Sequence, residues 1–396
     1  MPSTPRPDVV ALLRACKELP DEDVHRLVLA DWLEENATEP AEIALRDLIR
    51  AQVELDALPT GDPKRPALAG RAAGLLRQHG KAWLGSLDTD RVNWGLIHGL
   101  FVMTCHEEDL SRDQLGAPGF PEGWGWVERL TVLCTSSADL DVMAQAQPLG
   151  QIGTLDLRRN VLRKRGAQAL ARSPMLTDLC GLILSKTDLG HDGLAAIVGS
   201  PYLNGLVRLE LDGNGLDAAS MALLGRWPGK GNLLRLSLAE NALGGGIGAL
   251  LGGEPWERLR ALRLRNCYLP SDALVLLAAA PLRVSELDLA GNGEFDSPGL
   301  IGLLSAGWIG SLERLDLSYT TVSDDGMQAL ADCERLAGLG HLSYSGLRLH
   351  DRTVRSIIDS PHLKSLRCLD VRLSGYRWFP RDLLQAAQRR GLTILY

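Results

Sequence analysis

The sequence has few aromatic residues and no long hydrophobic run. Only 5% of its 396 residues are Phe, Trp or Tyr, whereas 45% are hydrophobic, so we expect a mainly aliphatic core. No stretch of about 18 apolar residues occurs, which argues against a membrane-spanning helix. Residues 1–8 lack the apolar core of a secretory signal. We therefore expect a cytoplasmic protein without a membrane partner.

Paired cysteines and an excess of positive charge are also absent. Seven cysteines are scattered singly, with no C-x-x-C pair. An odd number of isolated cysteines predicts free thiols in a reducing compartment. The formal net charge is −7, and nucleic-acid-binding proteins usually present basic surfaces. We expect no nucleic-acid partner.

Motifs that would indicate catalysis are missing as well. The sequence contains no G-x-S-x-G, no H-E-x-x-H and no G-x-x-x-x-G-K-[ST]. We therefore expect a protein that is not an enzyme, with no catalytic residues, no cofactor and no metal site.

A recurring frame is what the sequence does contain. Residues 206–216 read L-V-R-L-E-L-D-G-N-G-L, which fits the leucine-rich repeat signature L-x-x-L-x-L-x-x-N-x-L. Eight sister frames share this pattern, at spacings of 25 to 28 residues. The nine frames begin at Ile152, Leu179, Leu206, Leu233, Leu259, Val284, Leu312, Leu339 and Leu366, and a partial tenth spans 392–395.

Each frame predicts a strand, and a helix is expected between frames. Positions 4 and 6 alternate as inward residues of a strand. Helical runs are expected at 166–171, 192–199, 271–280, 324–331 and 351–359. Because helices are wider than the spacing of strands, the array must curve, with strands on the concave side. The unit resembles the ribonuclease-inhibitor class of leucine-rich repeat. This implies an α/β solenoid with a curved parallel sheet and helices on its convex side.

The ninth position of each frame is expected to be structural. Its side chain turns inward and satisfies backbone groups of the adjacent loop. Leu347 cannot do so, which predicts an irregular eighth repeat. The ninth residues are Asn160, Thr187, Asn214, Asn241, Cys267, Asn292, Thr320, Leu347 and Ser374.

The N-terminal segment is predicted to be helical, over 9–19, 24–36, 40–58 and 66–83. Its stretch R-L-V-L-A-D-W-L-E-E (26–35) resembles the bacterial repeat-companion domain, which precedes repeat arrays. That resemblance implies an architecture and no activity. We expect three parts: a helical repeat-companion domain at 6–88, a transition and cap at 89–150, and the solenoid at 151–396.

The N-terminal segment and the transition hold two further candidates. Asp31, Glu34 and Glu35 share a helix side and suggest either a site or an amphipathic helix with Trp32 in the core; we favour the second. In the transition, 96–104 and 127–133 are strand-like and predict degenerate cap repeats. The loop 117–126 carries Trp124 and Trp126, which would plug the cap or form a binding edge.

Positions 3, 5 and 7 of the frames, which we call the concave strand face, are free to meet a partner. Basic residues gather over frames three to five and acidic residues over frames six and seven. Such zones suit a charged protein partner; alternatively, these charges pair with each other across the ladder. The candidate contact residues, including the nearby Tyr319, are Arg208, Glu210, Asp212, Arg235, Arg263, Arg265, Glu286, Asp288, Arg314, Asp316 and Tyr319.

The sequence predicts a monomeric, non-enzymatic scaffold for protein–protein interaction. Relatives of this repeat class inhibit nucleases or activate small GTPases, so a regulator of an enzyme is the alternative. A third possibility is an enzyme with its site in the N-terminal segment. His341 and Cys368, at position 3 of adjacent frames, form a Cys–His pair without an orienting third group.

Overall fold

The computed structural model describes residues 4–59, 62–111, 114–133, 140–346, 349–372 and 379–396. The chain divides into two compact units. The first, unit 1, comprises residues 1–161 and 169–183, and the second, unit 2, comprises 162–168 and 184–396. The division falls within helix α7 (Arg163–Ala171).

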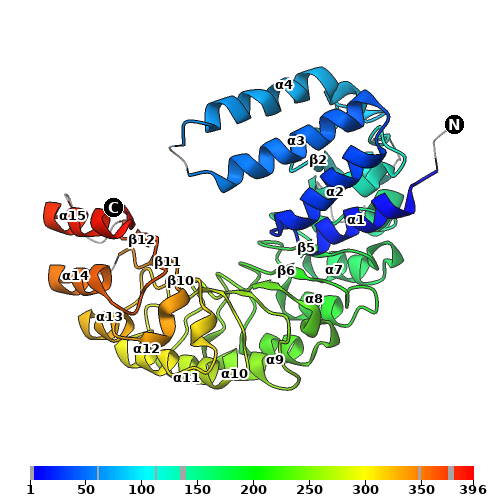
Figure 1. Ribbon diagram of the computed structural model, residues 1–396. Helices are drawn as coiled ribbons and strands as arrows, with labels where there is room; N and C mark the ends of the chain where they lie inside the picture. The colour runs from blue at the N-terminus through cyan, green and yellow to red at the C-terminus, as the bar shows by residue number, and fades with distance from the viewer. Residues whose placement is uncertain (1–3, 60–61, 112–113, 134–139, 347–348, 373–378) are drawn as a thin grey trace. The chain divides into compact units, whose positions relative to one another are not determined.

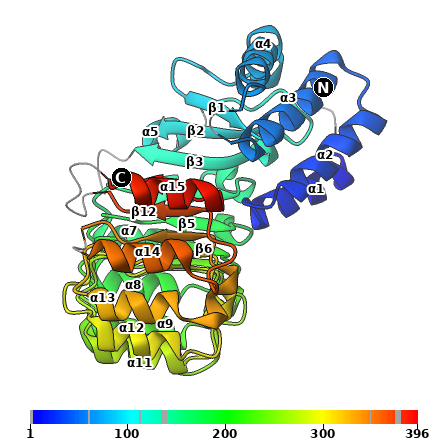
Figure 2. The same ribbon diagram turned by 60° about the vertical axis from the view of Figure 1, so that its left-hand side comes forward.

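Unit 1 begins with the four helices that the sequence predicts. They are α1 (Pro7–Glu18), α2 (Asp23–Asn36), α3 (Pro40–Ala57) and α4 (Arg65–Leu84). Proline occupies the first turn of α1, α3 and α4, where its missing N–H costs no hydrogen bond. Helices α3 and α4 lie side by side (Figure 2). Trp83 of α4 is buried and donates a hydrogen bond to the Ala41 carbonyl, 2.8 Å away.

One detail of α2 differs from the expectation. The buried side of this helix carries Arg26, Leu29 and Leu33, whereas Leu27 is exposed and Trp32 is half-buried. The prediction that Trp32 lies in the core is therefore wrong. The helical period of 3.6 places residues 26, 29 and 33 on the inner face, and the Trp32 ring instead packs under the guanidinium of Arg6, 5.2 Å from the ring centre.

The strand expected at 96–104 is a hairpin. Strands β1 (Asn93–Ile97) and β2 (Leu100–His106) are antiparallel, and the turn between them has positive φ at His98 (48°) and Gly99 (80°). A Cβ on Gly99 would lie 2.3 Å from Cγ1 of Ile49 in α3. Only glycine fits this turn, because it combines left-handed backbone with close packing.

The remaining strands of unit 1 run parallel. Strand β2 pairs with β3 (Val127–Leu133), β3 with β4 (Thr154–Asp156), and β4 with β5 (Gly181–Ile183). Before β3, Trp124 and Trp126 are buried in the short helix η1 (Gly123–Trp126), so they form part of the core and not a binding edge. The shorter helices of the unit are α5 (Glu107–Ser111), α6 (Leu140–Met143), η2 (Gln147–Gly150) and η3 (Pro174–Leu176).

Unit 2 is built on a parallel sheet in which each three-residue strand of frames three to nine covers positions 3 to 5, and a last strand, Thr393–Leu395, pairs with positions 3 to 5 of the ninth frame. The neighbouring strands align position for position, as the frames predict. The strands are β6 (Arg208–Glu210), β7 (Arg235–Ser237), β8 (Ala261–Arg263), β9 (Glu286–Asp288), β10 (Arg314–Asp316), β11 (His341–Ser343), β12 (Cys368–Asp370) and β13 (Thr393–Leu395).

Helices follow the strands in alternation and lie on the convex side of this sheet, whereas the strands line its concave side (Figure 1). The position-4 leucines of β6 to β12 are buried between the two layers. The predicted leucine-rich repeat solenoid, preceded by an N-terminal helical segment, is confirmed. The helices of unit 2 are α8 (Gly190–Val198), α9 (Ala218–Arg226), α10 (Ile247–Leu251), α11 (Ser271–Ala279), α12 (Ser297–Leu304), α13 (Asp324–Ala331), α14 (Asp351–Asp359) and α15 (Arg381–Arg390), with η4 (Pro228–Asn232), η5 (Gly244–Gly246), η6 (Ile309–Ser311) and η7 (Glu334–Gly338).

The ninth-position residues form the expected buried ladder. Asn214 donates from Nδ2 to the carbonyls of Leu184 (2.7 Å) and Leu211 (2.9 Å), and its Oδ1 accepts the amides of Thr187 (3.0 Å) and Leu189 (3.2 Å). Asn241 and Asn292 repeat this pattern. Thr187, Cys267 and Thr320 each donate to a loop carbonyl. The prediction for Leu347 and the ninth residue Ser374 lie outside the described residues.

Candidate functional site

The alignment of the strands places the predicted contact residues in rows. The position-3 row runs through Arg208, Arg235, Ala261, Glu286, Arg314, His341 and Cys368. Glu210, Arg263, Asp288 and Asp316 belong to the position-5 row. The structure therefore brings residues from seven repeats onto one surface, because position 3 of each strand pairs with position 3 of the next.

Most charges in the position-3 row are paired. Arg208 contacts Glu210 of its own strand, with 3.0 Å between Nε and Oε1. Glu286 receives two arginines: Nη1 of Arg235 lies 3.4 Å from Oε2, and Nε of Arg314 lies 3.6 Å from Oε1. Arg235 and Glu286 are two strands apart, and the small Ala261 between them leaves the path open.

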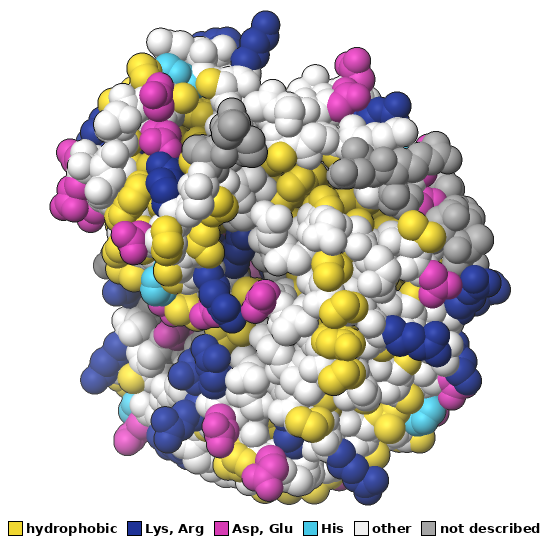
Figure 3. Space-filling view, turned by 90° about the vertical axis from the view of Figure 1, so that its right-hand side faces the viewer, with side chains coloured by type: hydrophobic (Ala, Val, Ile, Leu, Met, Phe, Trp, Pro, Cys, Tyr) yellow, Lys and Arg dark blue, Asp and Glu magenta, His cyan; other side chains and the backbone are white. Residues whose placement is uncertain are grey.

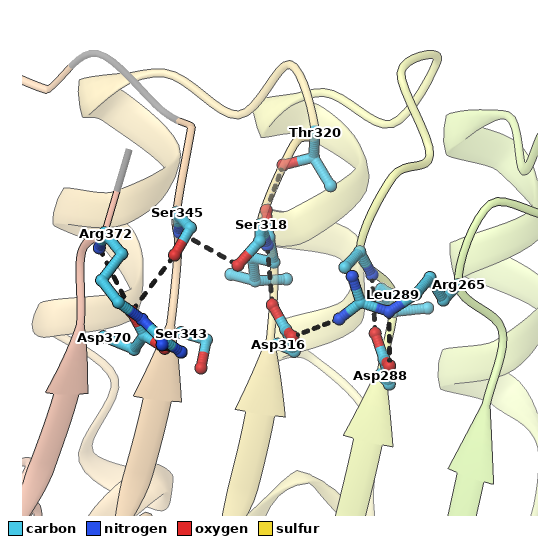
Figure 4. Close-up of polar contacts among 12 residues, drawn as sticks. Arg265, Asp288, Leu289, Asp316, Ser318, Thr320, Ser343, Ser345, Asp370 and Arg372 are labelled. Atoms are coloured by element: carbon cyan, nitrogen blue, oxygen red, sulfur yellow. Dashed lines mark hydrogen bonds and ion pairs between the residues drawn. The ribbon is translucent and has the colours of Figure 1, made fainter. Parts of the chain in front are cut away.

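Arg265, at position 7 of the fifth frame, spans two strands in the same way (Figure 4). Its Nε lies 3.1 Å from Oδ2 of Asp288, and its Nη2 lies 2.7 Å from Oδ2 of Asp316. The position-7 residue between them is Ala290, again small. The basic and acidic zones expected from the sequence are thus joined by ion pairs.

Aspartates at position 5 also have a backbone role that the sequence analysis missed. Asp288, Asp316 and Asp370 accept the amides of Ala290 (3.0 Å), Ser318 (2.9 Å) and Arg372 (3.1 Å), each two residues later. In unit 1, Asp156 accepts the Arg158 amide in the same way. Such local acceptance is a common use of aspartate at turns. The sequence could have indicated this role, because Asp recurs at position 5 in four frames.

A hydrogen-bonded chain continues across the last repeats (Figure 4). The Ser318 hydroxyl accepts the Ser345 amide at 3.0 Å, and the Ser345 hydroxyl donates to Asp370 at 3.2 Å. Asp370 in turn contacts the guanidinium of Arg372, with 2.6 Å between Oδ2 and Nη2. Burial acts to raise the pKa of Asp370, but the side chain and amide of Arg372 outweigh it, so the pKa is lowered.

Two other aspartates on this surface have raised pKa values. Burial raises the pKa of Asp212, although its carboxylate accepts hydrogen bonds from the Ser237 hydroxyl and the Ala239 amide. Burial likewise raises the pKa of Asp288, against the opposing effects of the Ala290 amide and Arg265. Both carboxylates already accept hydrogen bonds or ion pairs from neighbours within the sheet, so few of their lone pairs remain for a partner.

The concave strand face of frames three to nine is electrically balanced. It carries six arginines (208, 235, 263, 265, 314 and 372) and six acidic residues (210, 212, 286, 288, 316 and 370). Arg263 is exposed and has no ion-pair partner among the described residues. The Arg314 side chain is 66% exposed and Tyr319 is 48% exposed. These three side chains are therefore available for contact, as is Arg372, whose side chain is 63% exposed beside Asp370.

His341 and Cys368 do lie opposite each other on neighbouring strands, as predicted. Burial and the nearby Arg314 lower the pKa of His341, and burial together with Asp370 raises the pKa of Cys368. A nucleophilic cysteine needs the opposite shift, toward a thiolate. The pair therefore lacks the electrostatics of a catalytic dyad.

The N-terminal carboxylates pair with an arginine. Nη2 of Arg50 lies 2.7 Å from Oδ1 of Asp31 and 2.5 Å from Oε2 of Glu34, and all three side chains are substantially exposed. Within the described part of the chain, no group of three or more His, Cys, Asp and Glu side chains is arranged to hold a metal ion. The same residues include no helix long and apolar enough to cross a membrane.

A family model for the leucine-rich repeat matches residues 311–331. None of the curated proteins matches the sequence. Among solved structures, the chain is similar to the Rad7 and Elc1 complex in yeast, at 16% identity and a TM-score of 0.38, over 99% of this chain and 98% of that chain. It is also similar to the TLR13–ssRNA13 complex, at 17% identity and a TM-score of 0.39, over 68% of this chain and 39% of that chain. The chain is similar to an internalin from Listeria monocytogenes str. 4b F2365 as well, at 14% identity and a TM-score of 0.38, over 88% of this chain and 94% of that chain.

Proposed function

We propose that the chain is a non-enzymatic scaffold that binds a protein partner on the concave strand face of unit 2. The observation that carries the proposal is the exposure of Arg263, Arg314 and Tyr319 on a surface whose charges are largely paired, with Arg263 free of any ion pair among the described residues and Arg314 66% exposed despite its contact with Glu286. Arginine and tyrosine are the residue types that most often dominate the energy of protein interfaces. Because the repeats hold these side chains on a rigid sheet, binding requires little ordering of the scaffold.

The balanced charge of this face favours a protein partner over a nucleic acid. Binding to a phosphate backbone draws on many uncompensated Lys and Arg side chains. Here Arg208, Arg235 and Arg265 already contact carboxylates of the sheet. A partner that offers one or two acceptors to Arg263 and Arg314, with an apolar contact for Tyr319, fits the remaining groups.

The other predicted contact residues take a supporting part in this proposal. Glu210, Asp212, Glu286, Asp288 and Asp316 are held in ion pairs or hydrogen bonds within the sheet. Glu210, Glu286, Asp288 and Asp316 position the guanidinium groups of Arg208, Arg235 and Arg265. We infer that a partner meets them at the edges of the contact, where substitution costs less affinity than at the centre.

The experiment compares capture of partners from a lysate of the source cells by the wild-type chain and by two variants, Arg263→Glu and Tyr319→Ala. Partners lost by both variants belong to this surface. The matched control is Arg226→Glu, an exposed arginine at the end of convex helix α9, which should retain them. Unchanged capture by Arg263→Glu and Tyr319→Ala would refute the proposal.

The convex side offers a rival surface. Val275 and Leu276 of α11 and Ile301 of α12 are exposed large apolar residues. Figure 3 draws a different side, the one at the right of Figure 1, on which hydrophobic side chains also form a file, with acidic and basic side chains mixed on either side of it. A Leu276→Lys variant that loses the partner, while Arg263→Glu keeps it, would move the contact to the convex side.

The finer classification is also proposed. One α-helix per repeat supports ribonuclease-inhibitor-type repeats, and α1 to α4 support a bacterial repeat-companion domain at 6–88, followed by the cap at 89–150 and the solenoid at 151–396. We propose a monomer in the cytoplasm. A regulator of a nuclease or a small GTPase would use the same surface. It would differ in one readout, a changed rate of the captured enzyme.

A further inference from the structure

Unit 1 contains a cavity of about 350 Å³ beside helix α1. Val10, Leu13, Arg14 and Lys17 line it from one face of α1, at helical spacings of three and four residues. The opposite wall includes Ile152, from the segment before β4, and Cys180, from the segment before β5. This volume lies at the lower end of the range for small-molecule sites, and the mixture of apolar wall and few polar groups is typical of them.

Lys17 is the unusual member of the lining, because it is an ammonium in a buried position. The residue is only 8% exposed. Its Nζ donates one hydrogen bond, to the Gln151 carbonyl at 2.7 Å, and no carboxylate of the described residues lies within 4.0 Å. A buried charge without an ionic partner is costly. An ammonium has three protons to donate, so this contact leaves donor capacity for a ligand.

Gly153 helps to hold Lys17 in this position. A Cβ at Gly153 would lie 2.8 Å from Cγ of Lys17 and 2.8 Å from the Glu128 carbonyl oxygen. The aliphatic stem of Lys17 therefore lies directly against the backbone before β4. Any larger residue at 153 would displace the stem and redirect the ammonium.

The other charges of the lining have partners of their own. Glu122 contacts Arg6, with 2.9 Å between Nε and Oε1, and accepts the indole N–H of Trp126 at 2.9 Å. Arg14 contacts Glu18 at 3.0 Å and Asp178 at 3.5 Å. Among the described lining residues, Lys17 is thus the charged side chain without an ion-pair partner. Its single positive charge, in a lining that also contains the carboxylates of Glu122 and Asp178, suits a monoanion better than a dianion.

We propose that this cavity binds a small amphiphilic monocarboxylate, with its carboxylate on Nζ of Lys17 and its apolar body against Val10, Leu13 and Ile152. The site lies in unit 1 and does not depend on the partner proposed for unit 2. A bound carboxylate would supply the missing ionic partner, and the apolar body would cover Val10, which is 47% exposed.

The protonation of Lys17 supports this assignment. Burial lowers the pKa of Lys17 to about 8, against the opposing effect of Cys180. A bound carboxylate favours the charged ammonium and raises this pKa. Binding near pH 8 is therefore accompanied by proton uptake. If Lys17 only attached α1 to the Gln151 carbonyl, an added anion would not change its protonation.

The test is isothermal titration of the full chain with octanoate and with 3-phenylpropionate, using octanol as the uncharged comparison. We expect at least one carboxylate to bind, with affinity reduced about tenfold or more in Lys17→Met, which keeps the unbranched stem of the side chain without its charge, and largely kept in Lys17→Arg. The control Lys164→Met removes an exposed lysine that pairs with Asp192 and should bind as wild type.

Three outcomes of these titrations overturn the proposal, and the proton-uptake measurement described below supplies a fourth. The first is that neither carboxylate binds the wild-type chain. The second is equal binding by Lys17→Met, and the third is octanol binding as tightly as octanoate. Should Lys17→Met fail to fold, titrations of the wild-type chain at pH 8 in two buffers of different ionisation enthalpy decide the matter. Proton uptake supports the site, and its absence overturns it.

Discussion

Arg235 and Glu286 form an ion pair although strand β8 lies between their own strands, β7 and β9. The contact passes over Ala261, which occupies the same position of β8 and is buried. The small side chain on the middle strand thus allows charged side chains from repeats two apart to meet. Arg265 repeats the relationship with Asp316, across Ala290.

The Arg235–Glu286 pair gives the first prediction. A double-mutant cycle of Arg235→Met and Glu286→Gln should yield a coupling energy of about 0.2–1 kcal/mol, because both side chains remain accessible to solvent, which screens their attraction. The coupling should shrink in 1 M salt. Urea unfolding measures it, in wild-type protein and in an Ala261→Leu background, where the larger side chain blocks the path and should abolish it. Undiminished coupling in that background would contradict the geometry.

The buried asparagine ladder gives the second prediction. Asn214→Ala should lower the free energy of unfolding by about 1–3 kcal/mol, because it leaves buried amides and carbonyls of two loops unpaired. Asn232→Ala is the matched control, since this exposed asparagine makes one hydrogen bond at the surface. Chemical denaturation compares the two variants. A Tm of Asn214→Ala within a degree of wild type would refute the structural role.

The pKa of Asp370 gives the third prediction. Arg372 holds this pKa below its ordinary value, so the native state binds the proton less readily than the unfolded chain. The resulting stabilisation is present above about pH 4, the ordinary value for aspartate, and is lost as the pH falls through the folded-state value. Unfolding free energies at pH 3 to 7 should show wild type losing its advantage over Asp370→Asn below about pH 4. An advantage that stays constant over this range would be inconsistent with the shift.

The hairpin turn of unit 1 gives the fourth prediction. Gly99→Ala should destabilise the protein by about 1–3 kcal/mol, because the new Cβ meets Ile49 in a packed core and the backbone there is left-handed. Gly95→Ala is the control, since its Cβ would find ordinary contact, 3.6 Å from Cγ2 of Val102. Thermal unfolding of both variants checks this, and equal Tm values would count against the described turn.

Much of the fold was predictable because the apolar frame is periodic. Positions 4 and 6 of each repeat face the helices, so the spacing of leucines alone fixes strand phase, register and the place of Asn214. Helices α13 and α14 begin and end at the predicted residues, Asp324–Ala331 and Asp351–Asp359. The hairpin at Gly99 was not predicted, because strand-forming residues continue on both sides of the turn.

The candidate sites were less predictable, because they depend on how far side chains reach. The sequence placed Arg235 and Glu286 on one face, but their pairing depends on the small side chain at 261 and on rotamers that no frame encodes. Lys17 stood at the polar end of an amphipathic helix. Its burial arises from contact with Gln151 and Gly153, which lie about 135 residues further along the chain.

The balanced charge of the concave strand face bears on how quickly a partner can arrive. Six arginines and six acidic residues, mostly in contact with each other, produce little field beyond the surface. Without electrostatic steering, association proceeds at about 10⁵–10⁶ M⁻¹s⁻¹, well below the rates reached by oppositely charged proteins. A tight complex on this face must therefore be long-lived, so that its selectivity is expressed in slow dissociation.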